Sequence, residues 1–143
     1  MKTKVKILHI EHCSCHCEGT VKIYLPTINK EILACYQGGD QQIIEALPIG
    51  SIQNVFLYIW LATVNRHDCA SKAIMRKGET YSYELTGTYK GSINIDDFDY
   101  EIIDSELLLP VEKEFETNIE YKIGDYIKAD GEFFIDYFDL LTT

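Results

Sequence analysis

The chain has 143 residues, of which 46% are hydrophobic, so it can bury the core of one domain without disulfide bonds. Residues 1–71 contain six basic and six acidic residues, whereas residues 72–143 contain seven and seventeen and therefore carry the whole net charge of −10. An acidic surface repels the phosphates of nucleic acid, which argues against nucleic acid as the partner and favours a protein with a basic surface.

The first part of the chain predicts three β-strands. Residues 4–11 begin with alternating lysines and apolar residues, and residues 20–25 place Val21, Ile23 and Leu25 on one face. Residues 31–37 follow a turn, so they are expected to form a hairpin with the second strand. The chain shows neither a secretory signal nor a transmembrane segment, so we expect a cytoplasmic protein that does not bind membranes.

A cluster of cysteines and histidines separates the first two predicted strands. The odd total of five cysteines argues against a disulfide framework and for free or metal-bound thiols. The candidate metal ligands, including a distant pair, are His12, Cys13, Cys15, His16, Cys17, His67 and Cys69. Their two-residue spacing differs from the Cys-x-x-Cys knuckle of structural zinc sites. We therefore favour ordinary thiols and no cofactor, with zinc or a soft metal as the alternative.

A short helix and the most apolar stretch come next. Asp40 is a suitable N-cap, and Pro48 and Gly50 end the pattern, so one short helix is predicted near residues 40–47. Residues 55–64 contain no charge and many β-branched and aromatic residues, which predicts a strand buried on both faces with Trp60 inside the core. Residues 65–77 form the most basic patch and are expected to be a loop or a short helix. Within them, Cys69 beside His67 is a less favoured candidate nucleophile.

From residue 78 onward the pattern predicts β-structure. Gly87 and Gly91 interrupt a strand at residues 81–91 and indicate a bulge or bend. Two further strands, 99–103 and 106–111, form a hairpin, and residues 126–134 form the last long strand. Oxygen-bearing residues recur between Asn94 and Glu101. They indicate an acidic turn or, less favoured, a calcium loop. The calcium loop is less favoured because the segment from Asn94 to Glu101, which includes Tyr100, lacks the glycine that such a loop needs at its sixth position.

The segment Gly124-Asp-Tyr-Ile-Lys-Ala-Asp-Gly131 resembles a motif that begins a strand in OB-fold barrels. The glycine-interrupted strand and the hairpin before it fall in a compatible order, so the resemblance covers roughly residues 79–139. It implies a small, strongly bent barrel. OB-like nucleic-acid binding remains an alternative that the acidic charge disfavours.

We therefore predict a single mainly-β domain over residues 1–143, a small barrel or sandwich, OB-like in its C-terminal half. No phosphate-binding loop or hydrolase signature is present, and the sequence leaves open whether the protein is an enzyme. The expected function is a non-enzymatic interaction module that recognises a basic protein partner. Aromatic residues among carboxylates are the candidate anchors: Tyr100, Phe115, Tyr121, Phe134, Tyr137 and Phe138.

Overall fold

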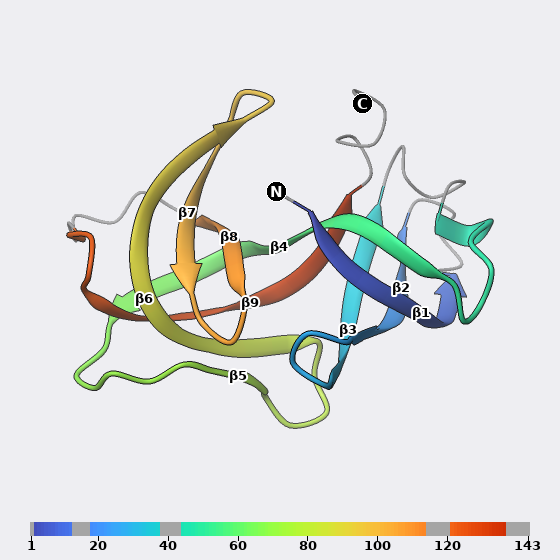
Figure 1. Ribbon diagram of the computed structural model, residues 1–143, viewed down its shortest axis with the longest axis horizontal. Helices are drawn as coiled ribbons and strands as arrows, with labels where there is room; N and C mark the ends of the chain where they lie inside the picture. Colours follow the sequence, from blue (N-terminus) through green and yellow to red (C-terminus); the bar gives the residue numbers. More distant parts are fainter. Residues whose placement is uncertain (1, 13–17, 38–43, 114–120, 137–143) are drawn as a thin grey trace. The chain divides into compact units, whose positions relative to one another are not determined.

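The computed structural model describes residues 2–12, 18–37, 44–113 and 121–136 (Figure 1). The regular structure of these residues is almost entirely β-strand. The strands are β1 (Thr3–His12), β2 (Glu18–Leu25), β3 (Lys30–Gln37), β4 (Ile52–Arg66), β5 (Ala73–Arg76), β6 (Ser82–Ile95), β7 (Phe98–Asp104), β8 (Leu108–Lys113) and β9 (Tyr126–Asp136). Eight of them form a closed circuit of pairings, β1–β2–β3–β9–β6–β7–β8–β4–β1. The predicted mainly-β barrel is therefore confirmed.

The contacts divide the chain into two compact units. The first unit combines residues Met1–Leu57 with Phe133–Thr143, and the second comprises Tyr58–Glu132. The long strands β4 and β9 each contribute residues to both units. No helix among the described residues is long and apolar enough to cross a lipid bilayer.

The first unit is built on the predicted N-terminal strands. β2 pairs antiparallel with both β1 and β3, and the β2–β3 register runs without interruption from Glu18 opposite Gln37 to Leu25 opposite Lys30. Alternate residues of β2 are fully buried, as the period-two pattern predicts. β1 also pairs antiparallel with β4, and β3 pairs parallel with β9.

The predicted short helix falls only partly on described residues. Ile44 and Glu45 are helical, the backbone N–H of Leu47 donates to the carbonyl oxygen of Ile44 at 3.1 Å, and the residues after Glu45 form turns. Residues 38–43 lie outside the described part. Glu45 accepts a hydrogen bond at 3.2 Å from the hydroxyl of buried Tyr36, which ties this turn to β3.

The second unit contains a ring of five strands. β4 pairs parallel with β8, the pairs β8–β7, β7–β6 and β6–β9 are antiparallel, and β9 returns to β4. The three sequence features that resemble an OB-fold become β6, the β7–β8 hairpin and β9. The fifth strand of the ring is β4, which precedes them in the chain and lies outside the range of the resemblance.

The two glycines of β6 do not end the strand; they let it curve and approach its neighbours (Figure 1). Gly91 has φ +112° and lies where the β6–β7 register shifts between Tyr89 and Gly91, so the predicted bulge is present. A Cβ atom on Gly87 would lie 2.5 Å from the backbone oxygen of Asp104. Gly87 is therefore required by close packing rather than by its dihedral angles.

β4 is the predicted core strand, and five consecutive residues from Val55 to Ile59 are buried on both of its faces. The prediction for Trp60 holds only in part: its side chain is partly buried, whereas the five residues before it are buried. Beyond it the pattern alternates, with Ala62 and Val64 buried and Thr63 exposed. Both-face burial thus ends at Ile59, and the rest of the strand covers the core with one face.

The prediction of a loop or short helix at residues 65–77 was also wrong in part. β4 extends to Arg66, and Ala73–Arg76 form the short strand β5, antiparallel to β6. The carboxylate of Glu106 accepts a hydrogen bond from the Ile74 backbone N–H at 2.7 Å. β5 is the last strand in the sheet order, and the side chain of Glu106 covers part of its outer edge.

Candidate functional site

The predicted metal cluster falls mostly on residues that the structure does not describe. Residues 13–17, which contain Cys13, Cys15, His16 and Cys17, lie outside the described residues, as does the side chain of His12. His67 is half-buried and Cys69 is exposed. The described residues contain no group of three or more His, Cys, Asp or Glu side chains that could hold a metal ion. Metal binding by the cluster remains a prediction.

The predicted aromatic anchors have different environments. Tyr100 and Phe134 are each only 5% exposed, so little of either ring is available to a partner. Tyr121 is half-buried, and its hydroxyl donates to the Val64 carbonyl oxygen at 2.9 Å. Phe115, Tyr137 and Phe138 lie outside the described residues.

The acidic run between Asn94 and Glu101 forms the tip of the β6–β7 hairpin. Asp96 and Asp97 are its two turn residues, with φ values of +49° and +68°. Positive φ at both positions is the signature of a type I′ turn, whose twist matches that of the flanking strands. Aspartate tolerates this conformation better than most residues do, although Asn-Gly is the preferred pair.

One face of this hairpin is apolar. The register pairs Ile93 with Tyr100 and Ile95 with Phe98, so all four side chains lie on the same face. At the inner end, the ring of Tyr100 meets that of Tyr58 edge-to-face, with centroids 5.6 Å apart. At the outer end, Phe98 is 58% exposed and Ile93 is 38% exposed. We call this outer part, Ile93, Ile95 and Phe98, the apolar strip.

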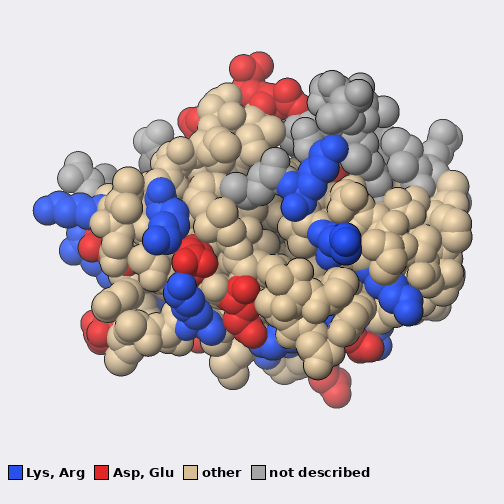
Figure 2. All heavy atoms as spheres, in the orientation of Figure 1, with Lys and Arg blue, Asp and Glu red and all other residues tan. Residues whose placement is uncertain are grey.

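The sequence around the apolar strip carries carboxylates and no cationic side chains. Residues 91–112 contain seven Asp or Glu and no Lys or Arg. Asp99 accepts a hydrogen bond from the Asn94 amide at 2.8 Å on the opposite face, whereas the side chains of Asp96 and Asp97 have no hydrogen-bond or ion-pair partner in the described part of the chain. In Figure 2, acidic side chains gather over the position of the hairpin turn seen in Figure 1.

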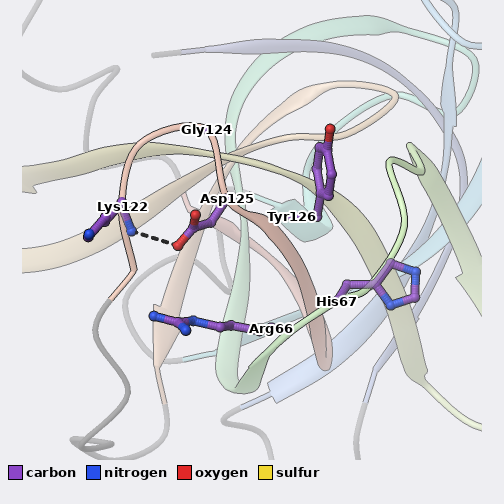
Figure 3. A pocket seen from close by; sticks show the side chains of 6 residues that line it. All are labelled: Arg66, His67, Lys122, Gly124, Asp125 and Tyr126. Carbon is purple, nitrogen blue, oxygen red and sulfur yellow. Dashed lines mark hydrogen bonds between the residues drawn. The ribbon is translucent and has the colours of Figure 1, made fainter.

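A second candidate surface is a pocket in the same unit. Its cavity volume is about 440 Å³. We call it the basic pocket; its lining residues are Arg66, His67, Lys122, Gly124, Asp125 and Tyr126. In Figure 3 the charged side chains of Arg66, Lys122 and Asp125 lie on the left, and the rings of His67 and Tyr126 lie on the right.

Backbone hydrogen bonds hold the two sides of the basic pocket together. The His67 N–H donates to the Tyr126 carbonyl oxygen at 2.8 Å, which joins the end of β4 to the start of β9. A turn is closed by the Asp125 N–H, which donates to the Lys122 carbonyl oxygen at 2.9 Å, and by the Lys122 N–H, which donates to the Asp125 carboxylate at 2.9 Å. Gly124 has φ +101°, a conformation that glycine adopts without strain.

The basic patch predicted at residues 65–77 is dispersed in the structure. Lys72 pairs with Asp104 at 2.8 Å, and the Arg76 guanidinium donates to backbone carbonyl oxygens of the turn that follows β5. Lys77 Nζ lies 3.1 Å from Asp130 Oδ1, close enough for an ion pair although this oxygen has no well-aligned hydrogen bond. Arg66 alone among these four lines the basic pocket, as does Lys122.

Sequence reasoning missed two features of these surfaces. The alternation of Ile93, Ile95, Phe98 and Tyr100 about a two-residue turn was a usable signal for the apolar strip. No local signal connects Arg66 with Lys122, which lie far apart in the chain and line one pocket because β4 pairs with β9.

No protein-family model, curated protein or solved structure matches this chain.

Proposed function

We propose that the protein is a non-enzymatic binding module that holds a basic protein partner at the β6–β7 hairpin. The observation that carries this proposal is the exposed apolar strip bordered by the carboxylates of Asp96 and Asp97. An apolar surface supplies the contact area of an interface, and the surrounding charges select the partner.

The inner end of the strip gives the surface a fixed position. Tyr100 is buried against Tyr58, so the apolar face of the hairpin continues from the core of the unit to its exposed tip. A partner that covers Phe98 and Ile93 would therefore pack on an ordered surface, and less conformational entropy is lost on binding than for a flexible loop.

The charges specify the chemistry of the partner. A complementary segment presents an apolar side chain to Phe98 and places lysines or arginines near Asp96 and Asp97. Exposed ion pairs contribute about 0.2–1 kcal/mol each and are screened by salt, whereas burying a phenylalanine ring contributes about 1.5–3 kcal/mol. The strip is thus expected to supply most of the affinity and the carboxylates most of the specificity.

A fluorescent peptide that alternates lysine and leucine is a suitable probe, with a glutamate–leucine peptide as its control. Anisotropy titrations should show saturable binding of the lysine peptide only. Phe98→Ser should weaken it at least tenfold, and Asp96→Asn with Asp97→Asn about threefold to tenfold. Asparagine is well accepted at positive φ, so the second variant keeps the turn.

The matched control replaces two exposed acids outside the hairpin, Asp68→Asn with Glu79→Gln. It should bind as the unaltered protein does. Equal losses in the control and hairpin variants would show a general effect of net charge and would refute the assignment of binding to the hairpin.

A further inference from the structure

We propose that the basic pocket binds a small phosphate ester that carries a flat ring. The phosphate is held by the side chains of Arg66 and Lys122, and the ring packs against Tyr126. This site is separate from the hairpin surface and takes a ligand of the opposite charge.

The charges of the pocket contrast with those of the whole protein. Two of its side chains, Arg66 and Lys122, are cationic, in a chain whose net charge is −10. Among the described lining residues one carries a carboxylate, Asp125, which accepts the Lys122 backbone N–H at 2.9 Å within the turn. A planar guanidinium, which can donate two parallel hydrogen bonds, and an ammonium group that lines the same pocket are typical partners of a phosphate group.

The ligand must be held by side chains rather than by the backbone. The N–H groups of His67, Lys122 and Asp125 all donate within the frame of the pocket. The Gly124 N–H donates to the Tyr89 carbonyl oxygen at 2.9 Å. The frame is therefore set before a ligand arrives, and the charged groups of Arg66 and Lys122 provide the contacts to the anion.

The pocket also has an aromatic end. Tyr126 is 42% exposed although it belongs to a strand, and its ring lies with that of His67 on the side away from the charged groups (Figure 3). The cavity volume of about 440 Å³ lies within the usual range for small-molecule pockets, about 300–1,000 Å³. A ligand with an anionic group at one end and a flat ring at the other matches both ends of the pocket.

An NMR titration at constant ionic strength, with inorganic phosphate and phenyl phosphate as probes, tests the proposal. The amide signals of His67, Gly124 and Asp125 should move with saturation, and phenyl phosphate should bind at least threefold more tightly than phosphate. Arg66→Gln should raise the dissociation constants of both ligands about tenfold. Tyr126→Ala should remove the advantage of phenyl phosphate and leave the affinity for phosphate unchanged.

Lys90→Gln is the matched control, because it removes an exposed positive charge of the same unit outside the pocket. It should leave both affinities unchanged. The proposal is overturned if the shifts grow without saturation and spread over all exposed lysines, if Arg66→Gln and Lys90→Gln behave alike, or if the two probes bind equally well. The spectrum of each variant without ligand shows directly whether its fold is intact.

Discussion

Replacing Gly87 with alanine would place a methyl group against the backbone of β7. The new Cβ atom would lie 2.5 Å from the Asp104 carbonyl oxygen and 2.9 Å from its carbonyl carbon, whereas ordinary contacts begin near 3.4 Å. The neighbour is backbone, and pairing with Thr88 on one side and Leu108 on the other holds it in place. β7 must therefore move by several tenths of an ångström or more.

The expected loss of stability is about 2–3 kcal/mol. Overpacking a tight site costs about 1–3 kcal/mol, and a weakened ladder hydrogen bond adds about 1 kcal/mol. The smaller entropy of the unfolded chain with alanine returns about 0.4–1 kcal/mol. For a chain of this size, the net loss lowers the melting temperature by roughly 4–12 °C.

Thermal unfolding followed by circular dichroism measures this loss, with Thr88→Ala as the control. Thr88 is the next residue of β6 and is half-buried, so its replacement should cost no more than about 1 kcal/mol. If Gly87→Ala melts within a degree or two of Thr88→Ala, the close approach of β6 to β7 is absent in solution and the reasoning fails.

Three further outcomes are expected. Burial, followed by the hydrogen bond to Glu45, raises the pKa of Tyr36 to about 12, so its contribution to stability is complete below pH 10 and is lost as pH rises toward 12. Tyr36→Phe should therefore flatten the fall of unfolding free energy between pH 10 and 12, measured by denaturant titration; an unchanged slope would contradict this. Chelators should not change the melting temperature, whereas a chelator-sensitive drop that Cys13→Ser with Cys15→Ser removes would establish the metal alternative. Single-stranded DNA should show no sub-micromolar binding by anisotropy at physiological salt, and tight, salt-sensitive binding would support the OB-like alternative instead.

The strands that the sequence predicted correctly carry their signal locally. In β2, the alternation of Val21, Ile23 and Leu25 with polar residues is sufficient, because one face of the strand is buried and the other is not. The uncharged run at the start of β4 likewise indicates burial on both faces. In β6, Gly91 marks its bulge because few other residues adopt φ +112°.

The errors concern features that depend on distant parts of the chain. β5 is four residues long and contains one buried side chain, Ile74, so its sequence has no usable periodicity. It is a strand because β6 pairs with it. Trp60 was expected in the core because it lies in an apolar run, but burial on both faces of β4 ends one residue earlier, at Ile59. An apolar run does not by itself show where both faces of its strand are covered.

One candidate site has a local sequence signal, and the other depends on residues that are distant in the chain. The hairpin tip is local, and the run from Asn94 to Glu101 already indicated an acidic turn; only the shared face of Ile93 and Phe98 required the register. The basic pocket is not local, because Arg66 ends β4 and Lys122 precedes β9. The Gly124-Asp125 pair indicated the start of a strand, yet nothing in it indicated which cation would lie opposite.

The net charge of a protein therefore helps to predict whether it binds an extended polyanion, but not whether it binds a small anion. A polyanion must follow a surface over many phosphates, so the excess of ten acidic residues works against it along its whole length. A single phosphate group meets only the charges within about one Debye length, roughly 8 Å at physiological salt. Among the described residues that line the basic pocket, two are cationic, Arg66 and Lys122, and one is a carboxylate, Asp125. In the two proposals above, carboxylates of the acidic half meet a basic protein at one surface, whereas a pocket that Arg66 of the other half helps to line takes a small anion at another.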